Sequence, residues 1–89
     1  MLVIQRRTIF ERDIKRCQKR NLDLNKLKEV MRLLAEEQVL SAKHRDHTLT
    51  GNYVGRRECH IQPDWLLIYK QEEGVIVFER TGTHSDLFK

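Results

Sequence analysis

The four histidines of this 89-residue sequence all lie in its second half, at positions 44, 47, 60 and 84. Most are flanked by polar residues instead of an apolar stripe. Histidine is the side chain whose ordinary pKa lies near neutrality, so a cluster of histidines can both take and give a proton at cellular pH. Cleavage of RNA requires that pair of transfers. The pattern therefore indicates acid–base chemistry, with a plain surface histidine as the alternative at each position.

Residues 56–62 alternate as a β-strand does, and the alternation decides which way the histidine of this segment points. Glu58 and His60 fall on one face of the strand, whereas Cys59 and Ile61 fall on the other. We therefore expect His60 on the polar face of a sheet, away from the side that packs into the core.

A hairpin between residues 65–71 and 75–81 is predicted around the turn residues that separate them. If this turn closes a regular hairpin, Lys70 pairs with Val75. Counting outward from that pair brings Trp65 opposite Arg80 and Asp64 opposite Thr81. One end of the sheet then gathers three side chains that can carry chemistry, unless a β-bulge shifts the register.

The chain turns at Gly82 just beyond this end of the sheet, so His84 is expected at the same corner. A cationic Arg80 suits a phosphate, and Trp65 or Phe88 suits an unstacked base. Each also has a structural alternative, because tryptophan often packs at the edge of a core and Phe88 can simply anchor the tail.

Metal binding is the less favoured interpretation of the segment 44–47, which contains two histidines and an aspartate. The segment lies in a predicted loop without helical spacing, and Cys59 is distant from it along the chain. Cys17 and Cys59 are isolated and are expected to be small buried side chains. We predict no metal and no cofactor.

The elements that must position these residues follow from hydrophobic periodicity and turn residues. Thr8 and Glu11 have the spacing of a capping box after a short strand near residues 2–7. Phe10, Ile14 and Cys17 then recur at helical spacing, and a second, more secure helix covers residues 24 to about 38. A long loop spans 39–55, and three strands are expected near 56–62, 65–71 and 75–81, with the apolar run 66–68 in the central strand.

Length and composition are typical of one small globular domain with a formal charge of +4. The basic helices suit a polyanion or an acidic protein partner. The sequence has no apolar stretch near the roughly 20 residues that span a bilayer, and its N-terminus lacks the pattern of a signal peptide. A cytoplasmic protein that does not enter a membrane is expected.

Three ordered blocks, residues 46–51, 57–69 and 78–88, closely resemble the YafQ subfamily of the RelE-like bacterial toxins, and the helix start at 24–27 fits the same pattern. The resemblance implies an α+β, RelE-like fold with element order β-α-α-β-β-β, in which a four-stranded antiparallel sheet packs against two N-terminal helices. It also implies an mRNA interferase, the toxin of a type II toxin–antitoxin pair.

The partners implied by the resemblance are an antitoxin that wraps the toxin, mRNA in the ribosomal A site and the nearby 16S rRNA. The toxin–antitoxin complex is expected to bind operator DNA through the antitoxin. The family's working positions correspond to the catalytic residues His84, His60, His47 and Asp64 and to the substrate-binding residues Arg80, Trp65 and Phe88. The implied reaction is attack by the RNA 2′-hydroxyl without a metal, with His84 as the main proton-transfer residue.

Two other functions remain open from the sequence. ParE-like toxins share the fold and poison DNA gyrase by binding, without this histidine set. A basic RNA-binding or ribosome-binding module explains the charge but leaves the clustered histidines as a coincidence. Both alternatives predict intact mRNA in intoxicated cells.

Overall fold

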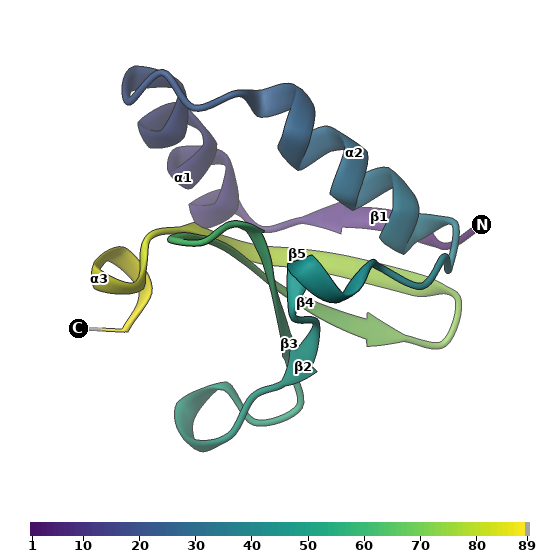
Figure 1. The fold of residues 1–89 in the computed structure, drawn as a ribbon. Coiled ribbons are helices and arrows are strands. Elements are labelled where there is room, and N and C mark those ends of the chain that lie inside the picture. The colour runs from purple at the N-terminus through teal and green to yellow at the C-terminus, as the bar shows by residue number, and fades with distance from the viewer. Residues whose placement is uncertain (89) are drawn as a thin grey trace.

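Helices α1 (Thr8–Lys19) and α2 (Leu24–Ala35) form around apolar residues at helical spacing and cover one face of the sheet (Figure 1). In the computed structural model, which describes residues 1–88, Phe10 and Cys17 of α1 are buried as expected. Asp23 caps α2 by accepting a hydrogen bond from the Asn25 backbone N–H at 2.9 Å. The second helix ends at Ala35, slightly earlier than the periodicity suggested.

The capping box predicted at Thr8 and Glu11 does not form. Arg7 occupies the N-cap position with extended backbone, so Thr8 is already the first helical residue and its hydroxyl cannot cap the helix. Glu11 pairs instead with Arg6, whose Nε lies 2.6 Å from Glu11 Oε1.

The sheet has five strands in the order β1-β5-β4-β3-β2. The remaining elements are β1 (Val3–Arg6), η1 (Ala42–His44), β2 (His47–Thr48), η2 (Gly51–Tyr53), β3 (Arg57–Gln62), β4 (Trp65–Glu72), β5 (Val75–Gly82) and α3 (His84–Leu87). The apolar run of β4 lies in the centre and is fully buried, which confirms the predicted central strand.

The expected α+β architecture is confirmed, but the sheet is not purely antiparallel. β3, β4 and β5 form an antiparallel meander, and β1 pairs in parallel with the outer edge of β5. The two-residue β2 adds a fifth strand at the other edge, within the segment expected to be a loop. Helices α1 and α2 connect β1, at one edge of the sheet, to β2 at the other edge. β1 thereby covers the edge of β5 that the meander would leave unpaired.

The register predicted for the β4–β5 hairpin is wrong. Glu72 pairs with Val75 across a two-residue turn, because Gly74 adopts a φ of +74°. A bulge between Ile68 and Tyr69 shifts the register further, so Arg80 lies opposite Ile68 instead of Trp65.

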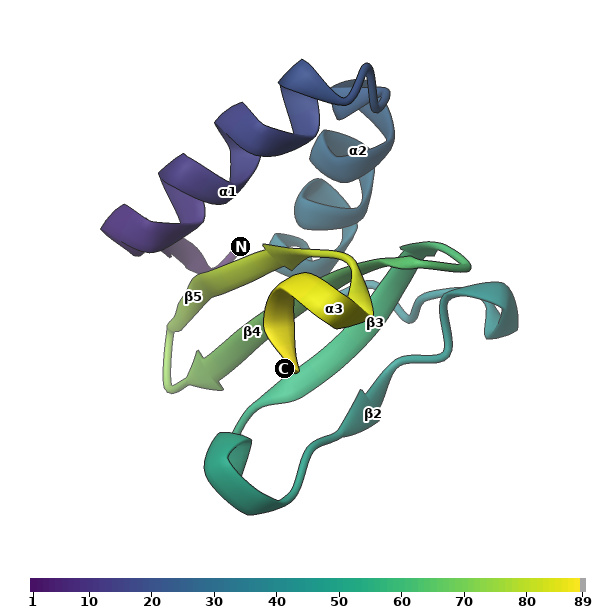
Figure 2. The ribbon, with the colours of Figure 1, turned by 90° about the vertical axis from the view of Figure 1, so that its left-hand side faces the viewer.

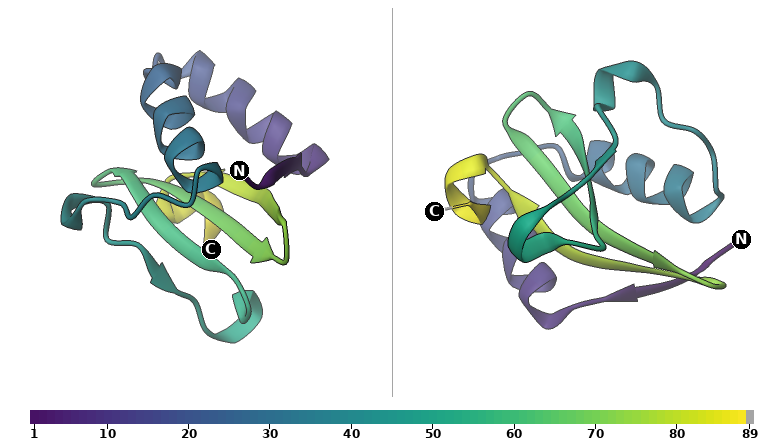
Figure 3. Two further views of the ribbon diagram at one scale, coloured as in Figure 1. Left: turned by 90° about the vertical axis from the view of Figure 1, so that its right-hand side faces the viewer. Right: turned by 90° about the horizontal axis from the view of Figure 1, so that it is seen from below.

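The face of the sheet opposite α1 and α2 is only partly covered. Leu66, Ile68 and Leu87 form a small apolar cluster there, with Tyr53 packed against it. α3 and the segment containing β2 and η2 lie on this side (Figures 2 and 3). Among the described residues, none of the helices combines the length and apolar character needed to span a membrane.

Candidate active site

Strand alternation places Glu58 and His60 of β3 on the partly covered face, while Cys59 and Ile61 pack into the core beneath the helices. This orientation confirms the prediction for His60. Glu58 and His60 are both largely buried, with 5% and 9% of their surface exposed. A carboxylate at this depth is costly unless charged or polar groups surround it.

The surrounding groups are three imidazoles. Glu58 Oε1 lies 3.5 Å from His47 Nε2, because β2 pairs His47 directly with Glu58. It also lies 3.5 Å from His60 Nε2, because Glu58 and His60 share one face of β3. The ring of His84 lies 5.8 Å from that of His60, measured between centroids. We call Glu58, His47, His60 and His84 the histidine cluster.

In each of these imidazoles, Nδ1 faces an oxygen that can only accept a hydrogen bond. His47 Nδ1 lies 2.6 Å from the Arg45 carbonyl, His60 Nδ1 lies 3.3 Å from the Pro63 carbonyl, and His84 Nδ1 lies 2.7 Å from Asp64 Oδ1. Nδ1 therefore carries the hydrogen, and Nε2 is the nitrogen left to exchange protons. The three rings therefore share one tautomer, with the hydrogen on Nδ1.

Asp64 and His84 form the most direct pair of the site. Asp64 Oδ1 accepts from the His84 backbone N–H at 3.0 Å and from Nδ1 at 2.7 Å. These hydrogen bonds, the backbone one first, lower the pKa of Asp64. A carboxylate bound to Nδ1 fixes the tautomer of an imidazole and stabilises its protonated form.

His84 is delivered to the site by α3, a single turn with its own capping box. Thr83 Oγ1 accepts from the Asp86 backbone N–H, and the Asp86 carboxylate accepts from the Thr83 backbone N–H. A Cβ atom at Gly82 would lie 2.8 Å from Asp86 Oδ2, so this turn requires glycine. Arg20, the C-cap residue of α1, donates to Asp86 at 2.7 Å, and this hydrogen bond holds the pKa of Asp86 well below its usual range.

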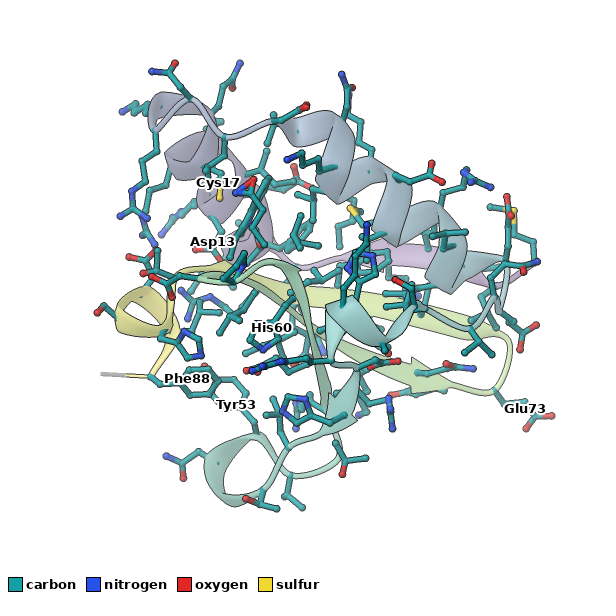
Figure 4. All side chains as sticks on the ribbon, viewed as in Figure 1. Asp13, Cys17, Tyr53, His60, Glu73 and Phe88 are labelled. Carbon is teal, nitrogen blue, oxygen red and sulfur yellow. The ribbon has the colours of Figure 1, made fainter. Side chains whose placement is uncertain are left out.

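Phe88 and Tyr53 line the neighbouring edge of the site, near His60 (Figure 4). Their rings contact edge to face at a centroid distance of 5.4 Å, and the Phe88 ring lies 6.4 Å from that of His84. Phe88 is 42% exposed. It can therefore offer a ring face to a base beside the cluster.

Arg80 reaches the same region from β5 but is tied to a buried carboxylate of α1. Its Nε and Nη2 donate to Asp13 at 2.8 and 3.2 Å, and Asp13 is fully buried. The hydrogen bond to Asp13 raises the pKa of Arg80, and Tyr53 contributes in the same direction. The guanidinium is thus held as a fixed cation by Asp13, with Tyr53 as a second neighbour.

Glu58, His60 and His84 also have the composition of a metal site. Their potential ligand atoms lie within 4.8 Å of one another. Bonds of about 2.1 Å to a shared ion would require only a small approach of these side chains. The donor set therefore fits a transition metal that prefers imidazole nitrogen.

Comparison with known proteins identifies the family. Residues 2–89 match the family described as YafQ, bacterial toxin of a type II toxin–antitoxin system. The chain is 48% identical over 80 residues to the mRNA interferase toxin YafQ of Escherichia coli K12, covering 89% of this chain and 87% of that protein. The chain belongs to the YafQ toxin family.

Solved structures of toxins share this fold over nearly all of the chain. The Escherichia coli DinJ–YafQ toxin–antitoxin complex gives a TM-score of 0.92 at 44% identity, covering 99% of this chain and 98% of the matched chain. A metal-bound toxin from Helicobacter pylori gives 0.93 at 40% identity, covering 99% and 100%. The RelE-like fold expected from the sequence is therefore confirmed for this YafQ-family chain.

In this YafQ-family toxin, the structure brings together most of the residues singled out from the sequence. His47, His60 and His84 converge, and Asp64 contacts His84 although the expected register was wrong. Trp65 does not join them.

The interpretation of Trp65 as a platform for a base is corrected by its burial. The side chain is 2% exposed within the core beneath the helices, and its Nε1 donates to Thr81 Oγ1 at 2.9 Å. Trp65 is the first residue of β4 and packs into the core, whereas Asp64 lies in the preceding β3–β4 turn and contacts His84. Phe88 is the exposed aromatic residue at this site instead.

Three residues of the YafQ-family site were missed from the sequence. Glu58 shares the strand face of His60, so alternation offered a signal. Asp13 lies at helical spacing between Phe10 and Cys17, which marked an acid on the buried side of α1. Tyr53 had no comparable signal, because it lies in a loop whose path the sequence does not specify.

Proposed function

We propose that this toxin is an endoribonuclease that cuts mRNA in the ribosome by acid–base catalysis within the histidine cluster. The observation that carries the proposal is the shared anchoring of Nδ1, which leaves the Nε2 atoms of three imidazoles available for proton transfer. The identity of the Escherichia coli relative as an mRNA interferase supports the same activity.

In the proposed reaction, one imidazole takes the proton of the RNA 2′-hydroxyl, and the 2′-oxygen attacks the adjacent phosphorus. The bond from phosphorus to the 5′-oxygen breaks, and a second, protonated imidazole gives its proton to that oxygen. His84, oriented by Asp64, is the main proton-transfer residue, assisted by His60 and His47. Arg80 stabilises the charge that develops on the phosphate, and Phe88 stacks on a base.

Glu58 has a supporting part in this proposal. Its carboxylate lies beside two Nε2 atoms and can accept a hydrogen bond from an imidazole that carries a proton there during turnover. A gyrase-poisoning toxin or a passive RNA-binding module has no use for this arrangement. The reaction class therefore distinguishes the proposal from both alternatives.

The products provide the decisive test. Purified toxin, ribosomes and a defined mRNA, incubated with a chelator of transition metals that leaves Mg²⁺ for the ribosome, should yield 5′-hydroxyl ends. The matching 3′ ends should carry a 2′,3′-cyclic phosphate or its hydrolysed 3′-phosphate, as measured by mass spectrometry. Fragments with 5′-phosphate ends, or loss of cleavage on chelation, would contradict the mechanism.

A bound transition metal is expected to inhibit the enzyme. Glu58, His60 and His84 would hold the ion through the atoms that the reaction needs for proton transfer. Cu²⁺ binds imidazole most strongly among the common divalent metals, so saturating Cu²⁺ should abolish cleavage, and chelation should restore it. Full cleavage by a toxin shown spectroscopically to hold Cu²⁺ at this site would disprove the expectation.

The proposed function includes a cognate antitoxin as partner, as in the Escherichia coli DinJ–YafQ complex. The toxin would act in the cytoplasm, where ribosomes present mRNA near the 16S rRNA. The basic helices suit contact with rRNA or with an acidic segment of the antitoxin. Binding of operator DNA would follow through the antitoxin.

A further inference from the structure

A groove of about 750 Å³, lined by His60 of the histidine cluster, opens beside the cluster. The start of α2 forms one wall, the η1 turn forms another, and the end of β3 with the β3–β4 turn forms the third. His60 lines both this groove and the cluster. An RNA strand with its scissile phosphate at the cluster could therefore place a neighbouring nucleotide in the groove, which His60 lines. Phe88, next to His84, is a separate contact for the strand.

The groove has an apolar floor and polar walls. The floor is lined by Val30, Leu33, Ile61 and Pro63. A flat base can rest on such a surface. The side-chain amides of Asn25 and Gln62 also line the groove, and an amide can donate to and accept from the edge of a base.

The charges of the groove favour a phosphate backbone. Lys26, Lys43 and Arg45 line it together with two acids. Both acids already have partners: Asp23 caps α2, and Glu29 is hydrogen-bonded by Arg32, which lowers the pKa of Glu29. The three cations outnumber the two acids, and Arg32 offsets the charge of Glu29.

Hydrogen bonds attach the walls of the groove to β3, the strand that carries His60. His44 Nδ1 donates to the His60 carbonyl at 2.7 Å and holds η1 against β3. A bulge between His60 and Gln62 changes the direction of the strand at this point, and Lys26 Nζ lies 3.5 Å from Gln62 Oε1. This explains His44, which the sequence left without a role.

We propose that this groove binds the nucleobase next to the scissile phosphate and sets the base preference of cleavage. The inference rests on the proposed function and adds a subsite to it. Asn25 and Gln62 read the edge of the base, the apolar floor supports its face, and the cations hold the backbone on either side.

The test compares cleavage rates on mRNAs that differ only at the base next to the cut. In Asn25→Ala and Gln62→Ala, the ratio of rates between preferred and disfavoured bases should fall by about tenfold, the scale of one hydrogen-bonded base contact. Gln18→Ala, an exposed amide of α1 outside the groove, should keep the wild-type ratio. An unchanged ratio in both groove variants would overturn the inference.

A binding measurement separates this inference from the proposed function. Titration of the toxin with a 2′-O-methyl RNA trinucleotide, which cannot be cleaved, should shift the side-chain amide NMR signals of Asn25 and Gln62. If these amide signals shift but the wild-type toxin does not cleave mRNA, the groove binds a base as inferred and the proposed reaction is wrong. If the two variants lose affinity for the antitoxin while base preference is unchanged, the groove is an antitoxin site and the inference is wrong.

Discussion

Replacing His84 with glutamine should lower the rate of mRNA cleavage by about two to four orders of magnitude, the usual effect of removing a positioned proton-transfer group. Glutamine can still accept or donate a hydrogen bond, but it cannot exchange a proton at neutral pH. His84 is half exposed on α3, and the capping box of that helix involves Thr83 and Asp86 instead. The fold should therefore be unaffected.

The measurement is single-turnover cleavage of a defined mRNA on the ribosome, with circular dichroism to verify folding. Ser85→Ala is the matched control, because Ser85 is the exposed neighbour in the same helix. It should cleave at the wild-type rate. A folded His84→Gln protein that cuts mRNA at nearly the wild-type rate would remove His84 from the mechanism.

Replacing Asp13 with leucine should destabilise the fold by about 3 kcal/mol, towards the lower end of the cost of breaking a buried ion pair. Asp13 accepts from Arg80 Nε and Nη2 and from the Thr81 backbone N–H. Leucine leaves all these donors without an acceptor in the interior. Arg80 retains some contact with solvent, which keeps the cost below its upper limit.

Urea unfolding measures this cost, and a double variant shows its origin. Asp13→Leu combined with Arg80→Leu should be more stable than Asp13→Leu alone, because the unpaired cation is removed as well. Glu11→Gln, which breaks an exposed pair with Arg6, should leave the unfolding midpoint close to that of the wild type. Wild-type stability in Asp13→Leu would show that the buried pair does not hold α1 to the sheet.

The sequence was most informative where periodicity and alternation decide an orientation. The apolar spacing of α2 and the run in β4 placed both elements correctly. Alternation along β3 correctly placed His60 on the partly covered face of the sheet and Cys59 in the core. These features depend on residues close together in the chain, and burying an apolar face fixes them.

Features that depend on turn geometry were not predictable in the same way. The β4–β5 register depends on the conformation of Gly74 and on a bulge that pattern alone does not mark. In the observed register Trp65 contacts Thr81 in the core instead of lying beside Arg80, so it is not the platform for a base that we predicted. Asp64 nevertheless reached His84, because both lie just beyond the same end of the sheet.

The sequence by itself determined the two helices, the strands of the meander, the orientation of His60 and the family resemblance. These properties rest on local periodicity and ordered motifs. Only the tertiary structure decided that Glu58 lies between two imidazoles, that Asp13 holds Arg80 and that β1 pairs in parallel with β5. Apart from the contact between Glu58 and His60 within β3, each of these contacts joins two different elements of the fold. Their partners are chosen by the packing of whole elements, which no local pattern specifies.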